Sequence, residues 1–212
     1  MKRAKIFAIT AMLPLLSSCA YQVASNIKPN FATYTAFDEK IRGSAAVYVD
    51  ASRARSDVKV TGLACSAHKF PVDVESDVTS AVVGTLGNLI ENVQKVDAPL
   101  TRQQMAERGL NAMIIVKVED MDIDLFVIPG FWSADMRSEA ELVLGVKADT
   151  KQGRQVGATV SGRGKATTNA GGACEGGATA IGQALEEATK EALAELAEKV
   201  SNSERLRNPR AS

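Results

Sequence analysis

The chain has 212 residues, and its 25 basic and 25 acidic side chains give a formal net charge of zero. This balance argues against a nucleic-acid-binding protein, which needs a concentrated basic surface. With one histidine in the chain and no close cluster of cysteine and histidine residues, we expect neither a metal site nor another cofactor.

Residues 1–18 have the three parts of a secretory signal. Three basic side chains within the first five residues precede the apolar stretch 6–16, which is too short to cross a bilayer as a helix. The segment then closes with Leu16-Ser17-Ser18-Cys19, which resembles the lipobox of bacterial lipoproteins. An ordinary cleaved signal with an incidental cysteine is the alternative.

The lipobox resemblance implies that the thiol of Cys19 takes a diacylglycerol and the freed amine a further acyl chain such as palmitate. Two or more acyl chains anchor a protein stably. In the family an aspartate after the cysteine usually retains the protein in the inner membrane, so Ala20 favours the outer membrane. We therefore expect an outer-membrane lipoprotein that faces the periplasm, with the membrane as its first partner and residues 19–42 as a lipidated tether.

Residues 43–200 are expected to form one domain. Residues 44–50 and 58–65 are strand candidates joined by a hairpin connection. Apolar residues at spacings of three and four predict a helix over 74–96, with Asp73 as its cap.

A short helix over 101–108 follows, capped by Thr101. The strand 111–125 changes the parity of its apolar residues, which predicts a bulge near Glu119 and Asp120.

Strict alternation predicts two more strands, over 140–148 and 156–163, as an antiparallel hairpin with one wet face. A long helix over 178–200 carries an apolar stripe on one side. Residues 201–212 are polar, and we expect a disordered tail. This order predicts an α+β two-layer sandwich, in which a mainly antiparallel sheet of about five strands carries two long helices on one face.

With the lipobox, this order of elements resembles the YajG-type outer-membrane lipoproteins, whose fold is akin to the N-terminal domain of TolB and to curli-secretion lipoproteins. The resemblance implies an anchored binding or assembly module without catalysis.

Cys65 and Cys174 remain once Cys19 is assigned to lipid. An even pair in an oxidising compartment predicts a disulfide bond, and two free thiols are the alternative.

Three motifs contain residues that could bind a ligand or take part in a reaction. Asp120-x-Asp122-x-Asp124 starts like a calcium loop but lacks its glycine and glutamate, so a solvated sheet face is the better interpretation. The glycine-rich loop 171–177 precedes a helix and could bind an anion, although Glu175 would compete for the amides. Ser66 and His68 could serve a hydrolase, but no Gly-x-Ser-x-Gly motif supports one.

The most unusual segment is 126–132, because connections between strands are normally polar. It holds the only tryptophan, and its bulky apolar residues are Phe126, Val127, Ile128, Phe131 and Trp132. Such a segment folds back on the core, dips into lipid or binds a partner.

We therefore expect a lipid-anchored, periplasm-facing, non-catalytic module that uses this segment to bind an envelope protein or a second copy. The alternatives are an accessory subunit of an export or transport machine, and an envelope hydrolase that uses Ser66 and His68.

Overall fold

The computed structural model describes residues 20–29, 39–62 and 64–207. The predicted signal segment and the lipobox cysteine, Cys19, lie outside these residues. The elements in chain order are β1 (Ile41–Asp50), β2 (Arg55–Thr61), β3 (Lys69–Asp73), α1 (Glu75–Leu89), β4 (Ile90–Lys95), α2 (Arg102–Glu107), β5 (Ala112–Pro129), β6 (Ala134–Thr150), β7 (Gly153–Asn169), α3 (Gly176–Ser201) and α4 (Glu204–Arg207).

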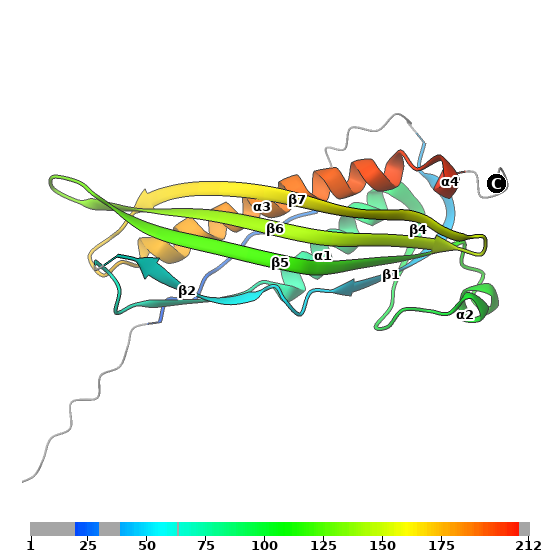
Figure 1. Cartoon of the computed structure of the whole chain (residues 1–212), viewed down its shortest axis with the longest axis horizontal. Helices are drawn as coiled ribbons and strands as arrows, with labels where there is room; N and C mark the ends of the chain where they lie inside the picture. Colours follow the sequence, from blue (N-terminus) through cyan, green and yellow to red (C-terminus); the bar gives the residue numbers. More distant parts are fainter. Residues whose placement is uncertain (1–19, 30–38, 63, 208–212) are drawn as a thin grey trace, which may run out of the picture.

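Strand β5 is the central strand of a seven-stranded sheet and pairs with β1, β2 and β6 (Figure 1). On one side β6 pairs with it antiparallel over its whole length, and β7 follows β6. On the other side β1 and β2 pair end to end along β5, both parallel to it, and are flanked by β4 and β3 respectively. The sheet is therefore mixed, and its longest part is the hairpin that β5 forms with β6.

Helices α1 and α3 cover one face of this sheet. The alternate residues of β6 that point to this face are buried and form the core with the apolar stripe of α3. The opposite face carries the charged residues of β5, β6 and β7. At one end a second small cluster packs α2 onto this face; its buried members are Ala46, Val96, Met105, Leu110 and Met113.

The α+β class, the long C-terminal helix and the bulge are confirmed. Every predicted stripe residue of α3 is buried, and the pairing of β5 with β6 shifts register between Val118 and Asp120. The predicted cap of α2 is present as well, since the Thr101 hydroxyl accepts the N–H of Gln104 while the Gln104 side chain accepts the N–H of Thr101.

Two local predictions were wrong, and the helix cap lies one residue from where it was expected. The sheet has seven strands rather than about five, because β3 was not recognised and the predicted helix 74–96 ends at Leu89, after which the chain becomes β4. No hairpin joins β1 to β2, since both bond to β5 instead. Val74 rather than Asp73 occupies the cap position of α1, without a side-chain hydrogen bond, but the Asp73 carboxylate accepts the N–H of Glu75, the first residue of the helix, at 3.4 Å.

The expected tether and tail also differ from the structure where it describes them. Val23 is only 5% exposed, and residues 20–29 pass over the helices, where Gly182 and Gly84 leave room for Ala24 and Pro29. At the other end, Leu206 of α4 is buried in the core. Residues next to the predicted anchor are thus part of the domain.

Candidate functional site

The β5–β6 hairpin runs on past every other described strand. The last residue of β2 pairs with Phe126, and the last residue of β7 pairs with Asp135. Past the end of β2, Val127, Ile128 and Pro129 of β5 pair with β6 alone, and the last of these pairs, Pro129 with Ala134, also lies past the end of β7. Residues 126–134 therefore form a projecting end, which we name the aromatic tip (Figure 1).

Two aromatic side chains at the turn of the aromatic tip stand in solvent. Phe131 is 89% exposed and Trp132 is 93% exposed, and their ring centroids lie 4.8 Å apart in an edge-to-face arrangement. Ile128 is 39% exposed, whereas Phe126 and Val127 are half-buried in β5. A side chain at Gly130 would collide with the carbonyl of Ser133, so the turn needs glycine there. The segment is therefore divided: Val127 packs against the core, whereas Phe131 and Trp132 do not fold back on it.

Charged residues begin just below the aromatic tip. The guanidinium of Arg137 lies 5.5 Å from the centre of the Phe126 ring and forms an ion pair with Glu139 at 3.6 Å. Residues 127–134 carry no charge. The aromatic tip is therefore uncharged from Val127 to Ala134, and charged residues of β6 follow it directly.

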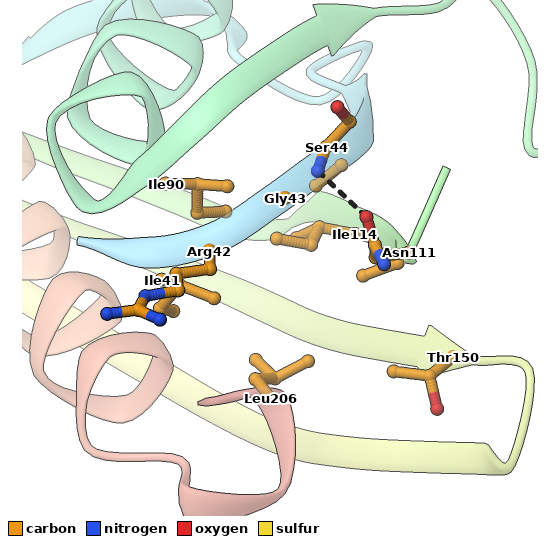
Figure 2. Close-up of a pocket in the computed structure, with 11 residues that line it drawn as sticks. Ile41, Arg42, Gly43, Ser44, Ile90, Asn111, Ile114, Thr150 and Leu206 are labelled. Carbon is orange, nitrogen blue, oxygen red and sulfur yellow. Dashed lines mark hydrogen bonds between the residues drawn. The ribbon is translucent and has the colours of Figure 1, made fainter. Parts of the chain in front are cut away.

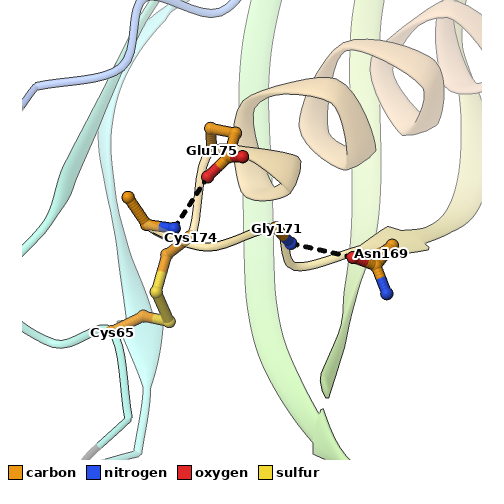
Figure 3. Close-up of a disulfide and its surroundings, with 6 residues drawn as sticks. Cys65, Asn169, Gly171, Cys174 and Glu175 are labelled. Carbon is orange, nitrogen blue, oxygen red and sulfur yellow. Dashed lines mark hydrogen bonds between the residues drawn. A yellow bond between two sulfur atoms is a disulfide. The ribbon is translucent and has the colours of Figure 1, made fainter. Parts of the chain in front are cut away.

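The predicted cysteine pair is present near the same end of the sheet (Figure 3). Cys65, in the connection between β2 and β3, is bonded to Cys174, in the loop before α3, with 6.0 Å between their Cα atoms. Both residues have positive φ angles, 61° and 65°. The bond holds the β2–β3 hairpin against the start of α3.

The glycine-rich loop before α3 carries its own anion. The carboxylate of Glu175 accepts the N–H of Ala173 at 2.9 Å (Figure 3). Hydrogen bonds from its own backbone N–H and from that of Ala173 lower the pKa of Glu175 below its usual value. Glu175 thus occupies the amides that could have bound an external anion.

Ser66 and His68 lie in the turn between β2 and β3. The His68 ring packs against Tyr21, with 5.4 Å between centroids, and its backbone N–H donates to the carbonyl of Cys65. In a Ser-His-Asp triad a carboxylate orients the histidine through Nδ1. The Nδ1 of His68 is buried without a hydrogen-bond partner in the described part of the chain, so this geometry lends the hydrolase hypothesis no support.

Two hollows on the surface of the described residues are open and polar: one of about 270 Å³ on the charged sheet face, and one of about 630 Å³ lined by Arg55, Asp73, Glu75 and Lys95. A cavity of about 20 Å³ lies between β1, β5 and Leu206 (Figure 2), and this volume accommodates about one water molecule. Asp122 and Asp124 lie on the charged sheet face, and no group of histidine, cysteine or acidic residues among those described could hold a metal ion. No helix of the described residues is long and apolar enough to cross a membrane.

A row of glutamates covers the outer edge of β7, which the sequence analysis did not anticipate. The backbone N–H groups of Ser161, Arg163 and Lys165 donate to the carboxylates of Glu195, Glu191 and Glu187, at 3.0, 2.7 and 3.0 Å respectively. Four helical residues rise about 6 Å and two strand residues about 6.7 Å, so the two rows stay in register over three pairs.

This edge is closed because α3 lies directly on β7. Side chains at Gly162 and Gly164 would collide with the carbonyl oxygens of Ala188 and Ala184. The two alternating glycines and the glutamates four residues apart are the sequence signal that could have revealed this contact.

No protein-family model and no curated protein matches the sequence. The fold is similar to that of protein XCC0632 from Xanthomonas campestris, a crystal structure assigned to the family DUF330. The two structures superpose with a TM-score of 0.51 at 12% sequence identity, over 86% of this chain and 96% of that chain. At this identity the similarity extends to the fold alone.

Proposed function

We propose that this protein is a lipid-anchored, periplasm-facing module of the bacterial envelope that acts by contact rather than by catalysis. The aromatic tip is its contact surface, and the acylated Cys19 is its anchor. The observation that carries the proposal is the exposure of Phe131 and Trp132 at the end of a projecting hairpin. Large exposed aromatic residues are costly to leave in water and are enriched where proteins bind other surfaces.

The geometry of the described residues supports contact in a second way. The aromatic tip is held by strand pairing and by a turn that requires Gly130, so its surface exists before any partner arrives. A preformed surface loses little conformational entropy on binding. The enclosed cavity beside Leu206 has room for about one water molecule, whereas the aromatic tip presents large apolar side chains directly to solvent.

Two experiments test the proposal. Radioactive palmitate should label the native protein in cells and should not label the Cys19→Ser variant. A photo-crosslinking amino acid should yield adducts with an envelope component when it replaces Trp132, and none when it replaces Lys151, which is exposed at the opposite end of β6. Equal adducts at the two positions, or an unlabelled native protein, would contradict the proposal. An adduct with a subunit of an export system would instead favour the accessory-subunit alternative.

A further inference from the structure

The N-terminal segment enters the domain at the end that carries the aromatic tip. Ala20 forms a parallel bridge with Lys69, and the N–H of Tyr21 donates to the carbonyl of Lys69 at 3.0 Å. The segment thus runs in the direction of β3, which is antiparallel to β2, while β2 is parallel to β5. The Ala20 end of the segment 20–29 therefore faces the end of the sheet that carries the aromatic tip; the dark-blue start of this segment and the aromatic tip both lie in the left part of Figure 1.

The predicted lipid anchor, Cys19, immediately precedes the first paired residue of the folded domain. The ring of Tyr21 packs against His68 and Phe70, with centroids 5.4 and 5.9 Å apart, and Val23 is buried. One peptide unit, about 3.8 Å between Cα atoms, separates the paired Ala20 from Cys19. Acyl chains on Cys19 would hold this end of the domain at the surface of the bilayer.

The strand register gives the reach of the aromatic tip beyond this anchor. Lys69 is opposite Lys59, and the next residue, Val60, is beside Leu125, so Ala20 is level with Asp124. Gly130 is six residues farther along β5, which corresponds to about 20 Å. The headgroup layer of one leaflet is only about 5–7 Å thick. This reach exceeds the depth of an interfacial segment, so the aromatic tip meets the leaflet with the hairpin inclined to the membrane plane, which keeps the charged residues below the tip out of the hydrocarbon.

The chemistry of the aromatic tip suits a shallow depth. The first charged residue after the aromatic tip is Asp135, opposite Ile128. The uncharged end of the hairpin, from this pair to the turn at Phe131, is therefore about 10 Å long. Segments that lie in the membrane interface are buried by about 5–10 Å, and tryptophan is enriched there. We infer that the partner of the aromatic tip is the membrane leaflet that holds the acylated Cys19, into whose interface Phe131 and Trp132 insert. This inference rests on the proposed function.

Trp132 itself reports the result, because it is the only tryptophan in the chain. The acylated native protein is reconstituted into vesicles of phosphatidylethanolamine and phosphatidylglycerol. We expect a blue shift of tryptophan emission, loss of quenching by aqueous iodide, and stronger quenching by nitroxides near the headgroups than by nitroxides at the chain ends. The matched control combines Trp132→Phe with Lys151→Trp, which places the probe at the opposite end of the hairpin; it should remain accessible to iodide.

The outcomes separate this inference from the proposed function. Emission and iodide quenching of Trp132 equal to those of the Lys151→Trp control would overturn the insertion. If a photo-crosslinker at position 132 then captured a protein, or a second copy of this chain, the aromatic tip would remain a contact surface with a different partner. Absence of acyl chains from the native protein would overturn the proposed function and this inference together.

Discussion

The glutamate row on α3 makes a prediction that can be worked from the structure. Replacing Glu187, Glu191 and Glu195 by alanine removes three carboxylates that accept backbone N–H groups of β7. A hydrogen bond of this kind contributes about 1 kcal/mol net at the surface, so the gross loss is about 3 kcal/mol. Relief of like-charge repulsion between glutamates four residues apart, about 0.2–0.5 kcal/mol per pair, and the helix propensity of alanine offset part of it. We expect the free energy of unfolding to fall by about 2 kcal/mol.

Urea unfolding followed by circular dichroism measures this loss of stability. Sedimentation velocity measures self-association, which should also change. An uncovered strand edge is a template for pairing with another chain, so the triple variant should self-associate more than the native protein. The control is Glu198→Ala, an exposed glutamate on the same helix that is not one of the three carboxylates accepting N–H groups of β7 among the described residues. A triple variant as stable and as monomeric as this control would refute the reasoning, because the carboxylates would then contribute nothing to the edge.

Two further predictions concern the loop before α3. Substituting both Cys65 and Cys174 by alanine opens a loop spanning a sequence separation of 109 residues; the chain-entropy model gives a loss of about 5 kcal/mol in unfolding free energy, and a loss below about 1 kcal/mol in urea unfolding would contradict it. The Glu175→Gln variant should melt below the native protein at neutral pH, because the native pKa of Glu175 lies below the usual 4.5. That difference is full above about pH 5 and disappears as the pH falls through the lowered pKa; a difference in melting temperature that does not change with pH would show that the charge of Glu175 is not responsible.

Elements with strong local periodicity could be predicted from the sequence. The apolar residues of α3 recur on one side of the helix over six turns, and those of β6 and β7 alternate strictly, so each pattern fits one structure only. The disulfide can be predicted by counting cysteines, because Cys65 and Cys174 are the two that remain once Cys19 is assigned to lipid. Such inferences need no knowledge of distant contacts.

Strand β4 and the pairing of β1 and β2 depend on long-range contacts. Leu89, Ile90 and Val93 continue the spacing of α1, so periodicity alone extends the helix through them. The structure pairs Ile90 with Ile41 instead, and a sheet partner 49 residues away leaves no mark on the local pattern. β1 and β2 looked like a hairpin because they are close in sequence, whereas each finds its partner in β5.

The candidate site could be located from composition, but its exposure could not. Phe131 and Trp132 were singled out because an apolar connection is unusual. Whether they are buried depends on where β2 and β7 stop along the hairpin, which is a property of the whole sheet. The direction in which the described segment runs from Ala20 likewise follows from three successive strand pairings rather than from the sequence of residues 20–29.

The topology separates the proposed contact surface from the residues that hold the domain together. A two-stranded ribbon is only marginally stable by itself, yet the ribbon here projects by only a few residue pairs from a sheet in which β5 has partners on both sides. The aromatic tip is therefore kept rigid by the sheet, while Phe131 and Trp132 contribute almost nothing to the core. Substitutions at these two positions can change what the hairpin binds without unfolding the domain, so a loss of binding there is a direct measure of contact.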